Sequence, residues 1–357
     1  KRYTGWKKKG RSHDHHLLLT FLFLQMLSST TRAASRRFQK GRGKGRSVMS
    51  VSNTVDPSTP SLVNTEWLKW RLGQKGVKLL DASWYMPAQA RDGLSEFKAK
   101  RIPGARYFHL DEVAEPNTSL PHMLPSEQAF AAAMDALDIT NADHVVVYDG
   151  LGIFSSPRAW WTFKCFGHER VSVLEGGLPS WESSSGPVST EGVPDEQLQR
   201  PGEAVRNPPS STRYKAKLDR SKVRSAQEML ANVGTKGETV VDARSPGRFV
   251  GKEPEPRHGL KGGHIPGAHN VPFPQVLKDG KQLKSPEELE RVFSDTGVDV
   301  KSRPVVGSCG SGLTACILAL AIHQINGKVI PIYDGSWSEW GMLPSVPIST
   351  ESPSGAV

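Results

Sequence analysis

Residues 305–316 read VVGSCGSGLTAC, and the organisation of the whole chain can be worked out from this stretch. A short apolar run leads into a Gly-rich loop, and apolar residues dominate again from 315 to 322. The second apolar run predicts a helix that is apolar nearly all round, and therefore buried, and that ends at Asn326-Gly327. We therefore expect a strand, a loop and a helix, with Cys309 in the loop.

Cys309 is the candidate nucleophile of this stretch. A cysteine just ahead of a helix meets the positive end of the helix dipole, which favours the thiolate. Gly310 and Gly312 allow the loop to turn its backbone N–H groups toward one point. Such N–H groups can activate a thiolate without a neighbouring general base. A cysteine buried only for packing would not need two glycines beside it at a strand-to-helix turn.

The other two cysteines have no comparable surroundings. Cys316 lies about two helical turns inside the apolar helix, where packing explains it better than chemistry. With Cys165 the chain has only three cysteines, and they are scattered. This number is too small for a disulfide framework or a clustered zinc site, so the sequence favours a reducing compartment and no metal.

The net charge of +10 is concentrated at one end of the chain. Residues 1–55 contain thirteen Lys and Arg against one acidic residue, so they carry +12 and the rest of the chain sums to −2. The body therefore lacks the basic excess that a nucleic-acid surface requires. Its length, within a chain of 357 residues of which 37% are hydrophobic, is sufficient for two domains of ordinary size.

Residues 1–57 form a basic leader with the composition of a targeting peptide. Between residues 26 and 55 there are seven Lys and Arg among Ser, Thr, Ala and Gly, and no acidic residue. This is typical of a transit peptide, and it predicts a mitochondrial protein, with a plastid as the alternative. Initiation at Met26 would give an organellar precursor, whereas initiation at Met49 would give a cytoplasmic protein. No apolar run reaches about 18 residues, so a membrane-spanning helix is not expected.

The body of the chain repeats itself once. Four landmarks recur at offsets of 159 to 163 residues. They pair residues 79–82 with 240–243, 102–105 with 265–268, 145–150 with 305–310, and 174–177 with 333–335. A nearly constant offset indicates two duplicated domains. The pairing places Asp149 where Cys309 stands, so only the second half has the nucleophile.

Each half alternates short β-branched runs with helical patterns. The helical patterns include residues 61–72, 126–137, 156–166 and 285–293. This alternation predicts an α/β fold in which each domain has a mostly parallel sheet flanked by helices. Residues 185–213 are rich in Ser, Pro, Gly, Glu and Gln, so they are expected to form a surface linker between domains 58–184 and 214–350.

Several further motifs accompany the Cys309 loop. They are LDASWY at 80–85, HMLP at 122–125, VDAR at 241–244, GRF at 247–249, PEPR at 254–257 and YDGSW at 333–337. Together with the tandem halves, these residues resemble the two-domain rhodanese family over about residues 60–348. The neutral loop Gly310-Ser311-Gly312 is most similar to that of the 3-mercaptopyruvate sulfurtransferases, because thiosulfate-type rhodaneses carry basic residues there. The resemblance implies two tandem rhodanese-like domains.

The resemblance also implies a site around Cys309. In the family two arginines hold the substrate, and here they are Arg248 and Arg257. A guanidinium matches a carboxylate bidentately, and 3-mercaptopyruvate has a carboxylate. The implied catalytic residues are Cys309 and Ser311, and the implied substrate-binding residues are Arg248, Arg257, Gly310, Gly312, Leu313 and Thr314. No cofactor or metal is implied.

One position departs from the family pattern. Relatives have His before the Ile-Pro-Gly of the first half, where this chain has Arg101; the second half has His264, which we expect to be structural. A relay suggested for the family would here use Asp92, the missing His and Ser311. A guanidinium at Arg101 can still hold Asp92 or a substrate anion. Arg244 is expected to brace the fold.

The resemblance implies ping-pong sulfur transfer. The Cys309 thiolate takes sulfur from 3-mercaptopyruvate, pyruvate leaves, and the persulfide passes its outer sulfur to a thiol, thioredoxin or cyanide. Thiosulfate as the donor is the nearest alternative. Phosphatase chemistry is another, but it uses Cys-x5-Arg and position 315 is Ala. A non-catalytic sulfur-binding protein is the third. No nucleic-acid or membrane partner is expected.

Overall fold

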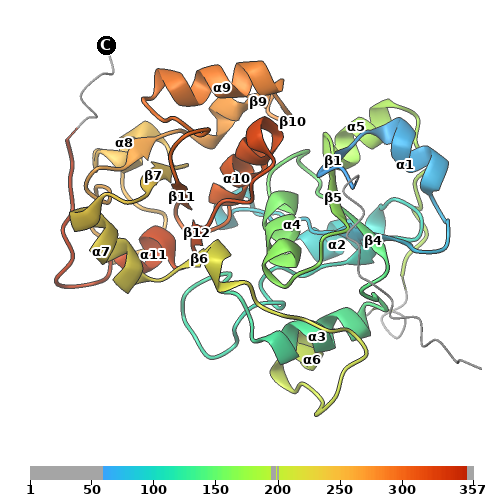
Figure 1. Ribbon diagram of the computed structural model, residues 1–357. Helices are drawn as coiled ribbons and strands as arrows, with labels where there is room; N and C mark the ends of the chain where they lie inside the picture. Colours follow the sequence, from blue (N-terminus) through green and yellow to red (C-terminus); the bar gives the residue numbers. More distant parts are fainter. Residues whose placement is uncertain (1–58, 194–197, 199–200, 352–357) are drawn as a thin grey trace, which may run out of the picture. The chain divides into compact units, whose positions relative to one another are not determined.

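Figure 1 shows the computed structural model of the chain, which describes residues 59–193, 198 and 201–351. The basic leader, both candidate initiator methionines and part of the expected linker lie outside the described residues. In the part that is described, no helix is long and apolar enough to cross a membrane.

The first half contains a sheet of five parallel strands. They are β1 (Leu62–Val63), β2 (Val77–Asp81), β3 (Arg106–Tyr107), β4 (His144–Tyr148) and β5 (Val171–Leu174). Their order is β1-β5-β4-β2-β3, and every neighbouring pair is parallel. Parallel strands need crossover connections, and the helices here are α1 (Thr65–Arg71), α2 (Gly93–Ala99), α3 (Glu127–Ala136), α4 (Ser156–Cys165) and α5 (Gly177–Ser183). A 3₁₀ turn, η1 (Pro87–Gln89), precedes α2.

The second half repeats this sheet. Its strands are β6 (Val223–Arg224), β7 (Thr239–Asp242), β8 (His269–Asn270), β11 (Val305–Ser308) and β12 (Ile332–Tyr333). Their order, β6-β12-β11-β7-β8, reproduces that of the first sheet strand for strand, again with parallel pairs. The internal repeat and the expected α/β class are therefore confirmed.

Helices and a small hairpin surround the second sheet. The helices are α7 (Ala226–Thr235), α8 (Pro246–Phe249), α9 (Pro286–Asp295), α10 (Ala315–Asn326) and α11 (Ser336–Trp340). The antiparallel hairpin consists of β9 (Leu277–Lys278) and β10 (Gln282–Leu283). The 3₁₀ turns are η3 (Arg220–Lys222) and η4 (Phe273–Val276).

Side-chain caps explain where the predicted helices begin. Ser126 and Ser285 each accept a hydrogen bond from the third residue of the helix that follows, α3 and α9 respectively. The helix expected over residues 61–72 begins later, at Thr65. Strand β1 occupies the start of that range, and the Asn64 side chain caps α1.

Part of the segment expected to run over the surface is folded. Helix α6 (Pro201–Arg206) packs against α3, and its Val205 is buried. Its Gly202 lies against the side chain of Glu112, because a Cβ there would be 2.4 Å from a carboxylate oxygen of that residue. The contact depends on one valine and small neighbours rather than on an apolar stripe, which is why the composition gave no indication of it.

The helix after the Cys309 loop is buried, as its apolar sequence predicted. Helix α10 is buried throughout residues 315–322, and it ends at Gly327, whose φ of 72° is the left-handed conformation typical of a helix C-terminus. It packs against α4 of the first half (Figure 1). One hydrophobic cluster includes Trp160 of α4 and Ile317 of α10, so the two halves share a core beside the Cys309 loop.

Candidate active site

Cys309 directly follows β11, the central strand of the second sheet. This is the carboxyl edge of the sheet, where parallel α/β folds place their ligands. Cys309 is 1% exposed, so it is shielded from bulk water. The strand, loop and helix expected around this residue are all present.

Helix α11 supports the Cys309 loop. The Cys309 N–H donates to Ser336 Oγ (3.2 Å), and the Trp337 N–H donates to the Cys309 carbonyl (3.0 Å). Ser338 donates to the Gly310 carbonyl through its N–H (2.8 Å) and its Oγ (2.6 Å). Since the carbonyl and the next N–H of a trans peptide point in opposite directions, the N–H groups after these two carbonyls point away from α11.

Ser336 is a supporting residue that sequence reasoning missed. Its φ is 47°, a left-handed conformation that costs a non-glycine residue about 1–3 kcal/mol. Its hydroxyl donates to the Tyr333 carbonyl at 2.7 Å while it accepts from Cys309. The motif at 333–337 marks this segment in the sequence, but nothing in it reveals the contact with Cys309.

Gly310 and Gly312 both have close neighbours. A Cβ at Gly310 would lie 3.0 Å from Nη2 of Arg248. At Gly312, where φ is 71°, a Cβ would lie 2.8 Å from the Asp334 carbonyl oxygen and 2.9 Å from Nη1 of Arg158. Glycine therefore lets guanidinium groups approach the loop backbone at two points.

Arg248 is held against the loop by a buried carboxylate. Its guanidinium lies 2.5 Å (Nη2) and 3.3 Å (Nε) from the two oxygens of Glu255. Glu255 also accepts from Arg244 at 2.8 Å. Arg244 is buried, pairs with Asp242 at 2.6 Å and lies 4.3 Å from the ring centroid of Trp337, so its contacts brace the fold. Glu255 belongs to the motif at 254–257, but sequence reasoning gave it no role.

Arg257 belongs to the same charged cluster. Burial lowers the pKa of Arg257 below the usual arginine value, and the neighbouring positive charge of Arg248 acts in the same direction. Cys309 and Asp111 oppose this effect because they stabilise the guanidinium charge. Arg257 therefore interacts electrostatically with both Arg248 and Cys309.

The first domain contributes an aromatic and acidic edge near Arg257. Asp111 accepts a hydrogen bond from Nε1 of Trp84 at 2.8 Å, and its other oxygen lies 3.0 Å from Nδ1 of His122. Burial lowers the pKa of His122, so the imidazole is neutral near pH 7. Sequence motifs at 80–85 and 122–125 mark two of these residues, whereas Asp111 lies outside every motif.

The remaining loop residues differ in what they can offer. Ser311 is 8% exposed, and its hydroxyl lies within the loop segment. Leu313 packs into the hydrophobic core, so it can serve a ligand only through its backbone. No side-chain bond from Thr314 caps α10, although this residue holds the N-cap position.

The first domain contains an equivalent loop whose backbone N–H groups bind a carboxylate of the chain itself. Asp149 follows β4 as Cys309 follows β11. Its carboxylate accepts hydrogen bonds at 2.9 to 3.0 Å from the backbone N–H groups of Leu151, Gly152, Phe154, Ser155 and Ser156. The Ser156 hydroxyl adds a bond of 2.6 Å. A loop of this shape therefore surrounds an anionic group with N–H donors, which is the arrangement expected for residues 310–314.

Asp92 has a structural contact in the first domain. Its carboxylate caps α2 by accepting from the Ser95 N–H at 2.7 Å, and the hydrogen bonds from Ser95 lower its pKa. Among the interactions of the described residues, none joins Asp92 or Arg101 to Ser311. The structure therefore does not bring together the residues of the relay that the family resemblance suggested.

Arg101 and His264 occupy equivalent structural positions. Arg101 forms an isolated antiparallel bridge with Ser189, and His264 forms one with Ser349. The Arg101 guanidinium also donates to the Glu191 carbonyl at 2.9 Å. Each residue thus ties the end of its domain to the turn before an Ile-Pro-Gly sequence, and the His expected from the family is replaced by another residue that makes this bridge.

The other two cysteines are core residues. Burial raises the pKa of Cys316 to about 12 and that of Cys165 well above the usual thiol value. Cys316 donates its S–H to the Gly312 carbonyl at 3.2 Å. Both thiols are therefore poor nucleophiles near neutral pH.

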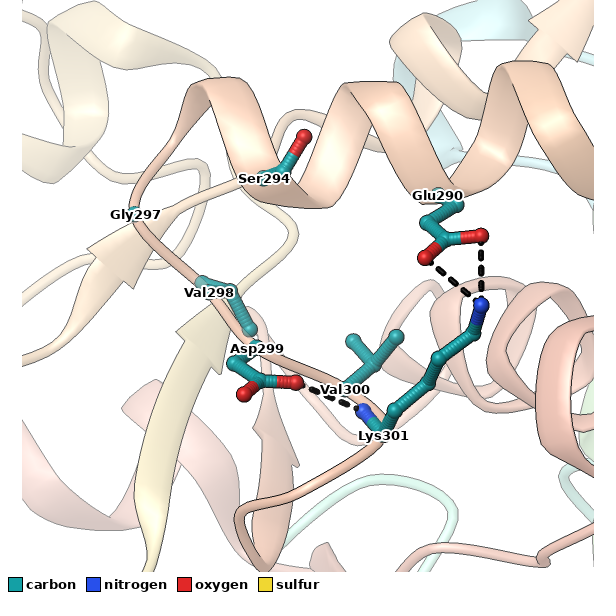
Figure 2. Close-up of a pocket in the computed structure, with 7 residues that line it drawn as sticks. All are labelled: Glu290, Ser294, Gly297, Val298, Asp299, Val300 and Lys301. Carbon is teal, nitrogen blue, oxygen red and sulfur yellow. Dashed lines mark hydrogen bonds and ion pairs between the residues drawn. The ribbon is translucent and has the colours of Figure 1, made fainter.

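A surface pocket of about 340 Å³ lies elsewhere, along α9 and the turn after it (Figure 2). Its lining includes Glu290, Ser294 and residues 297–301, and Lys301 pairs with Glu290 at 2.7 Å. None of the candidate site residues lines it. In the described ranges, no cluster of three or more His, Cys, Asp and Glu side chains could hold a metal ion.

Known proteins share both the sequence and the fold. The family described as Rhodanese-like domain matches residues 64–184 and 225–343. The chain is 42% identical to thiosulfate/3-mercaptopyruvate sulfurtransferase 1, mitochondrial, of Arabidopsis thaliana, over 91% of this chain and 87% of the relative. It is 42% identical to thiosulfate sulfurtransferase of Gallus gallus, over 78% of this chain and 93% of the relative. The crystal structure of SseA from Escherichia coli, described with the fold and catalytic mechanism of 3-mercaptopyruvate sulfotransferases, superposes with a TM-score of 0.67 at 32% identity, over 79% of this chain and 100% of that one.

Proposed function

Because the chain belongs to the two-domain rhodanese family and is a sulfurtransferase, we propose that it takes sulfur from 3-mercaptopyruvate through a persulfide on Cys309. The observation that carries the proposal is the uncharged loop at residues 310–312, with Arg248 beside it at Gly310. The positive charge of the site is thus on arginine side chains of α8 and of the segment after it. It is not on the loop that surrounds the sulfur.

The first half-reaction forms the persulfide. The Cys309 thiolate attacks the sulfur of 3-mercaptopyruvate, a new S–S bond forms, and the C–S bond breaks. The electron pair of that bond passes to carbon and gives the enolate of pyruvate, which takes up a proton and leaves as pyruvate. Backbone N–H groups from Gly310 to Thr314 stabilise first the thiolate and then the persulfide. The N–H groups around the Asp149 carboxylate support this role.

Arg248 and Arg257 hold the donor by its carboxylate and carbonyl. A guanidinium offers two parallel donors that fit a carboxylate, and bonds to a charged partner are about twice as strong as neutral ones. As the C–S bond breaks, negative charge moves onto the carbonyl oxygen of the enolate, so the same cations stabilise the transition state. Ser311 supplies a hydroxyl hydrogen bond within the loop.

The second half-reaction regenerates the free Cys309 thiolate. A thiolate acceptor attacks the outer sulfur of the persulfide, a new S–S bond forms on the acceptor, and the Cys309 thiolate is released. A small thiol or a dithiol protein such as thioredoxin can accept the sulfur in this way, whereas cyanide attacks the outer sulfur through its carbon and forms the C–S bond of thiocyanate. We propose that the protein acts in mitochondria. The basic leader and the mitochondrial name of the Arabidopsis relative support this location. A plastid, or the cytoplasm after initiation at Met49, is the alternative.

Thiosulfate is the second candidate donor, because the Gallus gallus relative is named for it. The two donors make different demands, since thiosulfate carries its charge directly beside the sulfur under attack. The deciding experiment measures kcat/KM for both donors on one preparation with one acceptor. A higher value for 3-mercaptopyruvate is expected, and a higher value for thiosulfate would reverse the assignment of the donor.

A further inference from the structure

Arg158, in the first turn of α4, is a buried cation of the first domain that contacts the catalytic loop of the second. It is 1% exposed. Its Nη1 donates to the Gly312 carbonyl at 3.1 Å, and its Nη2 lies 2.8 Å from Asp334 Oδ1 and also donates to the His122 carbonyl. Arginine is almost never fully buried unless it is paired, so these partners define its place.

Asp334 completes a clamp between the two domains. It directly follows β12 in the second domain, and its second oxygen accepts the Leu124 N–H of the first domain at 2.8 Å. Its backbone carbonyl lies close to Gly312, where a Cβ would be 2.8 Å away. The Arg158–Asp334 ion pair therefore fixes the loop with groups from both domains.

The contact with the Gly312 carbonyl acts on the part of the loop that faces the sulfur. A trans peptide is planar, so a fixed carbonyl also fixes the following N–H in the opposite direction. Arg158 and the Cys316 S–H hold this carbonyl together. The Leu313 N–H is thereby held pointing away from Arg158, and the loop cannot turn this peptide over without breaking two bonds.

The loop after Asp149 in the first domain fixes the position of Arg158. The Asp149 carboxylate accepts from the N–H groups of Ser155 and Ser156 and from the Ser156 hydroxyl. These residues begin α4, and Arg158 follows two residues later. The guanidinium also lies 4.8 Å from the ring centroid of Trp161 one turn further on. The loop that lacks a nucleophile thus anchors the helix that supports the other loop.

We propose that Arg158 is a positioning residue for sulfur transfer: its bond to the Gly312 carbonyl and its pair with Asp334 hold the Cys309 loop in the shape that stabilises thiolate and persulfide. This rests on the proposed function in taking Cys309 as the nucleophile. Since the loop serves every donor, loss of Arg158 lowers kcat for 3-mercaptopyruvate and for thiosulfate alike, with little change in KM.

The experiment must separate this role from simple adhesion between domains. The double variant Arg158→Met/Asp334→Asn removes both buried charges together, so no unpaired ion remains. The measurements are the thermal transition, the rate of Cys309 alkylation by iodoacetamide against pH, and steady-state kinetics with both donors. We expect a folded protein in which Cys309 alkylation at neutral pH and kcat with both donors fall about 10- to 100-fold. Wild-type rates in the folded double variant would overturn the proposal.

Two further variants make the result decisive. Arg158→Lys keeps the positive charge beside Asp334 but lacks the second nitrogen that donates to the Gly312 carbonyl. It should therefore fold and still lower kcat with both donors. If the double variant does not fold, wild-type rates in Arg158→Lys overturn the proposal. The matched control is Lys164→Met/Glu169→Gln, which removes the ion pair at 2.6 Å between the nearly buried Lys164 of α4 and the exposed Glu169. The control should retain wild-type rates, and an equal loss there would also refute the assignment to Arg158. If donor leaves no sulfur on Cys309 of the wild type, the proposed function fails instead.

Discussion

Asp149 and Cys309 occupy the same position in the two domains, each directly after the central strand of its sheet. The loop after Asp149 closes on that residue's own carboxylate, with five backbone N–H donors. In the proposed function, the loop after Cys309 surrounds a sulfur atom that accepts and releases another sulfur. The first loop is therefore a fixed structural element, whereas in the proposed function the second is open to the anion formed in the reaction.

Replacement of the nucleophile is the first prediction. Cys309→Ser should abolish sulfur transfer, because a serine hydroxyl stays protonated where a thiolate can form. Cys165→Ser and Cys316→Ser should remain active, since both thiols are buried and their pKa values are raised. Mass spectrometry after addition of donor alone should find one extra sulfur on Cys309. Finding that sulfur on Cys316, or finding none, contradicts the mechanism.

The second prediction concerns the two arginines of the site. Arg248→Ala or Arg257→Ala leaves the donor carboxylate without a charge-assisted hydrogen bond worth about 1.5–3 kcal/mol, which is roughly ten- to a hundredfold in kcat/KM for 3-mercaptopyruvate. Lysine should restore only part of this, because an ammonium lacks the bidentate fork. The exposed Arg213, whose side chain is 63% exposed, provides the control Arg213→Ala, which should be neutral. Near-full activity of both site variants would show that the donor is held elsewhere.

Local sequence was enough to predict the repeat, the parallel sheets and the strand, loop and helix around Cys309. These features depend on short apolar runs, on glycines at a turn and on an offset between similar stretches. The candidate residues Arg248 and Arg257 were predicted from motifs. In the structure Arg248 lies beside Gly310, and Arg257 interacts electrostatically with Cys309.

The supporting residues could not be predicted, because their contacts join distant parts of the chain. Arg158 lies 154 positions from Gly312, and Ser336 lies 27 positions from Cys309. Helix α6 was missed for a different reason, since its contact with α3 depends on small residues rather than on a periodic apolar face. In each case a contact made only in the folded state fixes the role of the residue.

A third prediction uses the buried carboxyl at the end of β2. Burial raises the pKa of Asp81 to about 7, whereas an unfolded aspartate has a pKa of about 3.9. Between these values the folded protein keeps a proton that the unfolded chain has lost. The stabilisation from protonated Asp81 is therefore fully present below about pH 4 and is lost as the pH rises to about 7. Asp81→Asn should match the wild type near pH 4.5 and exceed its free energy of unfolding by a few kcal/mol at pH 8.

The comparison between variant and wild type is essential to this test. Burial lowers the pKa of His144, His168 and His323 to about 4, so these groups weaken the fold as the pH falls from about 6.5. They are present in both proteins and cancel in the difference measured by urea unfolding. Asp242, the equivalent residue of the second domain, pairs with Arg244, so Asp242→Asn should instead destabilise the protein at both pH values. An Asp81→Asn difference that does not change with pH would disprove the role of Asp81.

The fourth prediction concerns residues 1–57. Their basic composition predicts a removable targeting peptide, so a shortened chain that begins at Pro60 should turn over donor as the full chain does. In cells, residues 26–57 fused to a fluorescent protein should direct it to mitochondria. Fluorescence confined to the cytosol would exclude the targeting role, whereas plastid fluorescence would support the alternative destination. Loss of activity in the shortened chain would show that the leader contributes to the folded enzyme.

The last prediction asks whether loop charge selects the donor. Thiosulfate is a compact dianion whose charge lies beside the attacked sulfur, whereas 3-mercaptopyruvate carries its carboxylate some distance away. Basic residues in place of Gly310 and Ser311 should therefore raise kcat/KM for thiosulfate relative to 3-mercaptopyruvate, because they add positive charge beside the attacked sulfur of thiosulfate. A side chain at Gly310 must also displace Arg248, whose Nη2 would lie 3.0 Å from the new Cβ, so kcat/KM for 3-mercaptopyruvate should fall at the same time. Gly310→Ala separates the two effects, since it displaces Arg248 without adding charge. Gly310→Ala should lower kcat/KM for 3-mercaptopyruvate but should not raise kcat/KM for thiosulfate. If the basic variant leaves the ratio of the two kcat/KM values unchanged, donor selection lies outside the loop.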